Sequence, residues 1–77
     1  MNDTWNHRVV NLKTQNGGDD WLVIQEVFYE DGKPVGYTDA CYGSETMEGL
    51  RLTYERMIRA LDLPVLNEDM TEVSDER

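Results

Sequence analysis

Apolar strand-forming residues gather in three stretches of the first half of the chain, separated by polar turn residues, a pattern typical of β-strands. We expect these strands over residues 6–13, 21–30 and 35–42. The middle stretch carries apolar residues at both parities, which indicates a strand in the centre of the sheet. The three stretches therefore predict an antiparallel meander in which the second strand lies between the first and the third.

The residues that connect these stretches support the same order. Asp31 and Gly32 stand between the second and third strands, and this dipeptide favours a two-residue hairpin turn because both residues readily adopt positive φ. Pro34 has no N–H to donate to a neighbouring strand, so it belongs near the start of an edge strand. Gly17 and Gly18 mark the loop between the first and second strands.

The second half of the chain has apolar residues at the three- and four-residue spacing of one helix face. This face consists of Met47, Leu50, Tyr54, Met57, Ile58 and Leu61. Thr46 is the expected N-cap, and Pro64 ends the helix because it disfavours helical geometry at Leu63. We predict an α+β fold, a three-stranded antiparallel meander with one C-terminal amphipathic helix packed on one face of the sheet.

The chain is short enough to limit its domain organisation. Its 77 residues are about half the usual size of a domain. We expect residues 1–66 to form a single β-β-β-α domain. Residues 67–77 combine low hydrophobicity with high charge and are predicted to be a disordered acidic tail.

The charge balance restricts the partners of the chain. Sixteen acidic residues against seven basic ones give a net charge of −9. This sign argues against direct binding to nucleic acid and to anionic membranes, which attract positive charge. The longest apolar run, residues 21–24, is far too short for a membrane span, and we expect no signal peptide. We expect a cytoplasmic protein of a bacterium or of a phage-infected cell, where a single cysteine is unremarkable.

Few residues could carry catalysis or hold a metal. Cys41 and His7 are the only cysteine and histidine, too few for a four-ligand zinc site. The predicted sheet separates them by the central strand, about 9 to 10 Å, which is too far for a hydrogen-bonded pair. Asp19 and Asp20 could offer oxygen ligands, but their loop lacks the alternating carboxylates of a calcium-binding EF-hand. We therefore expect no enzyme, no catalytic residue, no cofactor and no metal.

The predicted sheet has more apolar surface than one helix can cover. The second strand is apolar on both faces, and a domain this small buries only about 60% of its unfolded surface. Either long side chains, the N-terminus and Val65-Leu66 shield the second face, or another protein covers it. We expect a non-enzymatic protein–protein interaction domain that forms a homodimer or binds another protein. The predicted contact residues are Trp21, Val23, Tyr29, Tyr37 and Leu52.

Two alternatives stay open at this point. The sheet could have the opposite orientation, with Leu22, Ile24 and Phe28 facing outward. The acidic surface could also imitate DNA, which would make the chain an inhibitor of a nucleic-acid enzyme, as phages and mobile elements encode.

Several short motifs resemble those of a family of short uncharacterised bacterial and phage proteins. The family pattern reads WNxRV, EVxY, DGKPxGYT and a helix that ends in ALxxPVL. The matching stretches of this chain are residues 5–9, 26–29, 31–38 and 60–66. The resemblance implies that the fold exists elsewhere, and it brings no activity or site residue with it.

The junction before the predicted helix is similar to the N-terminal unit of HicB-type antitoxins. There, three strands lead into one helix through a glycine, a serine or threonine and a glutamate, as at residues 43–48 of this chain. The resemblance implies a non-catalytic unit related to ribonuclease H that binds a small toxin protein or self-associates. HicB proteins also carry a DNA-binding segment, and no basic helical segment follows Leu66 here.

Overall fold

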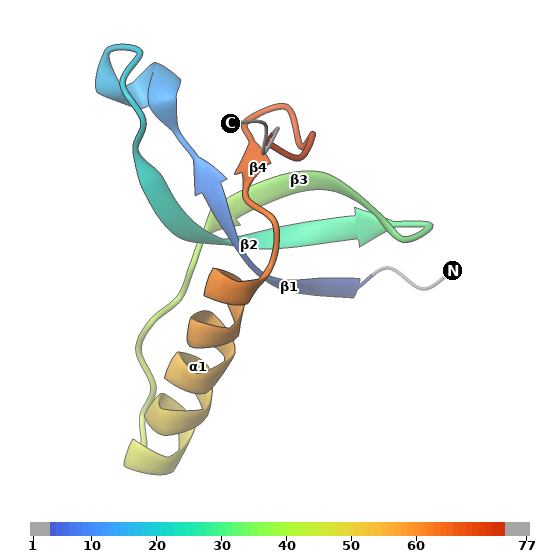
Figure 1. Cartoon of the computed structure of the whole chain (residues 1–77). Helices are drawn as coiled ribbons and strands as arrows, with labels where there is room; N and C mark the ends of the chain where they lie inside the picture. Colours follow the sequence, from blue (N-terminus) through green and yellow to red (C-terminus); the bar gives the residue numbers. More distant parts are fainter. Residues whose placement is uncertain (1–3, 74–77) are drawn as a thin grey trace.

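The computed structural model describes residues 4–73 of the chain (Figure 1). Within this part, four strands form one sheet in the order β3-β2-β1-β4. β1 pairs with β2, and β2 with β3, in antiparallel fashion, whereas β4 runs parallel to β1. The strands span Thr4–Asn11 (β1), Leu22–Glu30 (β2), Lys33–Asp39 (β3) and Leu66–Asn67 (β4).

The α+β class is confirmed, but the sheet is not a simple three-stranded meander. The three predicted strands exist in the predicted order, and a fourth strand makes the sheet mixed. β4 is only two residues long, and Leu66 and Asn67 pair with Val10 and Asn11 of β1. So short a strand has no periodicity of its own, which is why the pattern of the sequence does not reveal it.

The predicted hairpin turn lies between β2 and β3. Asp31 has φ 52° and Gly32 has φ 79°, the positive values that a type I′ turn requires. Pro34 lies in β3, at the edge of the sheet, opposite Tyr29. The register shifts between Phe28 and Tyr29, so the pairing beside the turn is irregular.

The hydrophobic core lies on one face of the sheet. Val10, Leu12, Val27 and Leu66 are at most 5% exposed and form one cluster. Four further side chains pack against it, those of Val23, Tyr29, Tyr37 and Met70. Because Leu66 and Met70 follow the helix in sequence, the returning chain covers this face.

The helix does not lie along the sheet as predicted. α1 spans Met47–Arg59 and continues into the short 3₁₀ helix η2, Ala60–Asp62. Figure 1 shows α1 projecting away from the strands, with only its C-terminal end beside β1. No residue of α1 is buried, and Ala60, at the start of η2, is the buried residue that directly follows the helix. Leu66 and Met70 pack on the sheet face of Val23, Tyr29 and Tyr37, which was predicted to meet a partner protein.

The start of α1 follows the prediction. Thr46 has extended backbone geometry, and its Oγ1 accepts a hydrogen bond of 3.0 Å from the N–H of Gly49. This bond satisfies one of the free N–H groups of the first helical turn.

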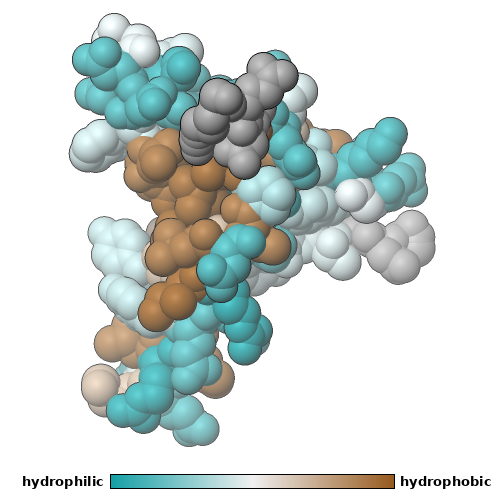
Figure 2. All heavy atoms as spheres, in the orientation of Figure 1, coloured by the Kyte–Doolittle hydropathy of each residue, from teal (hydrophilic) through white to brown (hydrophobic). Residues whose placement is uncertain are grey.

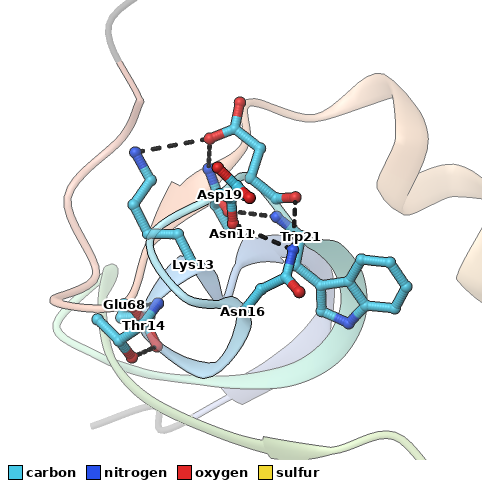
Figure 3. A network of polar contacts seen from close by, with 8 residues as sticks. Asn11, Lys13, Thr14, Asn16, Asp19, Trp21 and Glu68 are labelled. Atoms are coloured by element: carbon cyan, nitrogen blue, oxygen red, sulfur yellow. Dashed lines mark hydrogen bonds and ion pairs between the residues drawn. The ribbon is translucent and has the colours of Figure 1, made fainter.

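A polar network orders the loop between β1 and β2 (Figure 3). The side chain of Asn11 donates to Asp20 Oδ1 (3.0 Å) and accepts from the N–H of Trp21 (2.9 Å). Thr14, in the 3₁₀ helix η1 (Lys13–Asn16), donates its N–H and its hydroxyl to the carboxylate of Glu68, at 3.2 and 2.6 Å. The loop is therefore tied to a residue 54 positions later in the chain.

The chain after β4 turns back on itself. The N–H of Asn67 donates to the carbonyl of Thr71 (2.7 Å), and the N–H of Val73 donates to the carbonyl of Val65 (2.8 Å). Part of the predicted acidic tail, residues 67–73, is thus placed by backbone hydrogen bonds, and residues 74–77 lie outside the described residues. Within residues 4–73, no helix has the length and apolar content needed to cross a bilayer.

Candidate interaction surface

The apolar face of α1 reaches solvent along most of its length. Met47 is 67% exposed, Tyr54 45%, Ile58 61% and Leu61, in η2, 64%. Leu50 lies among them and is half-buried. We call these five residues the α1 stripe. Figure 2 shows apolar residues, in brown, at the surface beside the hydrophilic residues of the helix.

The other side of the same helix accounts for its contact with the rest of the chain. Gly49, Thr53 and Met57 are half-buried, and Ala60 is fully buried. At about 100° per residue these positions share one side of the helix, and the α1 stripe is on the flank next to it. The helix thus has one packed side and one apolar flank that nothing in residues 4–73 covers.

The size of this flank makes its exposure costly. Burying a large apolar side chain contributes about 1.5–3 kcal/mol relative to leaving it exposed. A helix of thirteen residues is also marginal by itself, since most helical stability in proteins comes from packing of the apolar face. A partner that covers the α1 stripe would therefore stabilise the helix as well as bind to it.

The helix differs from the rest of the chain in its charge. Residues 47–62 contain three acids, Glu48, Glu55 and Asp62, and three bases, Arg51, Arg56 and Arg59, so their net charge is zero. The whole chain has a net charge of −9. α1 and η2 together form a neutral surface on a strongly acidic protein.

A shallow hollow opens in the first half of the α1 stripe. Its volume is about 250 Å³, and its lining residues are Met47, Leu50, Arg51 and Tyr54. A hollow of this kind can receive one apolar side chain of a partner.

The structure does not bring the five predicted contact residues together. Val23, Tyr29 and Tyr37 are half-buried and pack against the core cluster. Much of their surface is therefore already buried within the chain. Trp21 is 56% exposed just before β2, and Leu52 is 50% exposed on α1. Their role in an interface stays a prediction, and the exposed pair lies on two separate elements.

The opposite face of β2 is less covered. Leu22 is 59% exposed and Phe28 39%, while Ile24 is half-buried. This is the orientation that the sequence left open. The predicted surplus of apolar surface therefore exists on this face as well as on the helix.

The residues considered for chemistry lie apart or are engaged in structure. Cys41 is exposed after the end of β3, whereas His7 is buried in β1. Hydrogen bonding from Asn11, followed by the charge of Lys13 at 3.5 Å, holds the pKa of Asp20 below its ordinary value of 3.8. Within residues 4–73, no three His, Cys, Asp or Glu side chains are grouped so that they could hold a metal ion.

Sequence reasoning found the residues of the α1 stripe but not their exposure. A helical spacing of apolar residues shows that a face needs cover, and it does not show what provides the cover. The sequence offered Val65-Leu66 after Pro64 as a cover for the second sheet face, and Leu66 is indeed buried on the face of Val23 and Tyr29.

No protein-family model, curated protein or solved structure matches this chain.

Proposed function

We propose that this chain is a non-enzymatic interaction domain that self-associates through the α1 stripe. The observation that carries the proposal is the exposure of Met47, Tyr54, Ile58 and Leu61 on one flank of a projecting helix. Exposed apolar surface of this extent, bordered by polar residues, is characteristic of sites where another protein binds.

Charge favours a second copy of the chain as the partner. Two copies with a net charge of −9 each repel one another over most of their surfaces. The neutral surface of residues 47–62 is where they can approach with the least repulsion. An acidic protein of another kind would meet the same neutral surface, but the spacing of the stripe supports self-pairing.

The spacing fits an antiparallel pair of helices. Met47, Tyr54 and Leu61 are seven residues apart, the repeat of a coiled-coil seam. If the two-fold axis passes beside Tyr54, Met47 of one copy lies level with Leu61 of the other. Leu50 then lies level with Ile58, so each apolar residue meets an apolar residue.

Charged residues beside the stripe agree with this arrangement. Arg51 and Glu55 lie on the same flank, one turn apart. In the antiparallel pair, Arg51 of one copy comes within about two residues, or 3 Å along the axis, of Glu55 in the other. Because the dimer is two-fold symmetric, the Arg51–Glu55 pair occurs twice. Such pairs add orientation and specificity more than affinity.

The test is the solution mass of the full chain and of two matched variants. Sedimentation equilibrium over about 10 to 300 µM covers the weak association expected of a small interface. The wild-type chain should approach twice its monomer mass of 8.9 kDa. Ile58→Glu should stay monomeric at every concentration, because it places a charge in the middle of the stripe.

Leu52→Glu is the matched control. Leu52 is also exposed on α1 but lies about 120° around the helix from Ile58. It should leave the dimer intact, and a monomer with this variant would instead assign the interface to Leu52. A wild-type chain that stays monomeric at the highest concentration would contradict the proposal.

A further inference from the structure

A second feature lies on the other flank of α1, where the C-terminal end of the helix meets the first half of β1. It is a pocket of about 510 Å³, lined by Trp5, Asn6, His7, Arg56, Arg59 and Leu63. Pockets that bind small molecules have volumes of about 300–1,000 Å³. Arg56 stands about 160° around the helix from Ile58, so the pocket and the α1 stripe are separate surfaces.

The pocket concentrates positive charge on an acidic protein. Arg56 and Arg59 are one helical turn apart, and both are exposed. Among residues 4–73 the one ion pair within 4.0 Å joins Lys13 and Asp20, so no described carboxylate forms a direct ion pair with either guanidinium. The two charges outweigh the roughly half elementary negative charge that a helix dipole places at its C-terminal end.

A buried polar atom in the wall of the pocket lacks a partner. His7 is 5% exposed, and its Nε2 makes no hydrogen bond with any described residue. Buried polar groups are nearly always hydrogen-bonded, so an unpaired ring nitrogen points to a group outside the chain. The ring of Trp5 meets the His7 ring edge to face, with centroids 5.4 Å apart, and Leu63 adds a second apolar surface to the lining.

We propose that this pocket binds a small organic anion with a flat apolar body. A carboxylate or phosphate group would lie between Arg56 and Arg59, because planar guanidinium groups bind both oxyanions with paired hydrogen bonds. The apolar body would pack against Trp5 and Leu63, which places a polar atom of the ligand within reach of His7 Nε2.

The experiment titrates the full chain with phenyl phosphate at constant ionic strength. NMR spectra are recorded after each addition. Additions up to about 10 mM cover a dissociation constant near 1 mM, as expected for a small probe. The signals to follow are the indole N–H of Trp5, the ring nitrogens of His7 and the Nε–H groups of Arg56 and Arg59. Saturable shifts at these groups support the proposal.

Two further probes separate the parts of the ligand. Benzamide has a ring but no charge, and inorganic phosphate has the charge but no ring. Each should bind more weakly than phenyl phosphate, by at least about tenfold for benzamide, since hydrogen bonds to charged groups are the stronger ones. Equal binding of benzamide would overturn the role of the arginines, and equal binding of inorganic phosphate would overturn that of the apolar body.

Substitutions then locate the site. Arg56→Gln combined with Arg59→Gln should weaken phenyl phosphate binding at least about tenfold, whereas Arg51→Gln, on the opposite flank, should leave it unchanged. Ile58→Glu should also leave it unchanged, which keeps this proposal distinct from the dimer. Absence of saturable shifts in the wild-type chain, or an equal loss with Arg51→Gln, would overturn the site.

Discussion

Arg8 donates a hydrogen bond of 2.7 Å from Nη1 to the hydroxyl of Tyr29, and both side chains lie on the core face of the sheet. The other amino group of Arg8 donates to the carbonyl of Pro64, also at 2.7 Å. A single buried guanidinium, 7% exposed, therefore joins β1 and β2 to the segment that follows η2. This contact holds the returning chain beside the sheet face of Val23 and Tyr29, which was predicted to meet a partner.

Removing the hydroxyl of Tyr29 should weaken this junction. In Tyr29→Phe the ring still packs against the core, but the buried Arg8 loses one acceptor. We expect a loss of about 1.5–3 kcal/mol in the free energy of unfolding, the usual contribution of a hydrogen bond to a charged group. Urea denaturation followed by circular dichroism measures it. Tyr42→Phe, at a tyrosine that is 66% exposed, should change nothing, and equal stability of the two variants would refute the role of the bond.

β4 should contribute to stability far beyond its two residues. Leu66 is completely buried in the core cluster, so Leu66→Ala should cost about 2–5 kcal/mol. Leu22→Ala removes the same atoms at a position that is 59% exposed and should cost much less. The comparison needs only the thermal unfolding midpoints of the two variants at one protein concentration. Similar midpoints would mean that the segment after Pro64 is not part of the folded core.

The sequence predicts the local elements of this fold better than their arrangement. The strand pattern, the Asp31-Gly32 turn and the Thr46 cap each depend on a few neighbouring residues, and the structure has all three. The arrangement of the elements depends on contacts between residues that are far apart in the sequence. Arg8 donates a hydrogen bond to the carbonyl of Pro64, 56 residues later, and no periodicity contains such a contact.

The same limit applies to the candidate sites. The apolar residues of the α1 stripe follow from helical spacing, but their exposure follows from where the chain goes after Leu63. The pocket at His7, Arg56 and Arg59 needs β1 and the end of α1 to be neighbours. Among His7, Arg56 and Arg59 the sequence singled out only His7 for chemistry, and it placed His7 apart from Cys41.

The loop network should give the chain a specific dependence on acid. The folded pKa of Asp20 lies below 3.8, mainly because Asn11 donates to its carboxylate and Lys13 adds a positive charge. A lowered folded pKa gives stability that is present above the unfolded pKa and is lost as the pH falls through the folded value. Asp20→Asn should therefore be less stable than the wild-type chain near neutral pH, and this difference should shrink as the pH falls below 3.8.

Urea midpoints between pH 2 and pH 7, at fixed protein concentration, test this dependence. Glu30→Gln is the control, since Glu30 is exposed at the end of β2 and forms no ion pair among the described residues. Its difference from the wild-type chain should not follow the same curve. If Asp20→Asn keeps a constant difference down to pH 2, the Asp20 contacts do not stabilise the ionised form.

Disulfide cross-linking of single-cysteine variants can test the antiparallel pairing of α1. Cys41 is exposed, so it is first replaced by serine. In that background Tyr54→Cys places the two thiols beside the two-fold axis, where the Cα atoms can come within the roughly 7 Å that a disulfide allows. Met47→Cys places them about fourteen residues apart along the axis, or 21 Å, which no disulfide can span.

Mild oxidation followed by non-reducing electrophoresis should give a covalent dimer with Tyr54→Cys and a monomer with Met47→Cys. A parallel pair would cross-link at both positions, and adding Ile58→Glu to Tyr54→Cys should abolish the covalent dimer because the charged side chain prevents the helices from meeting.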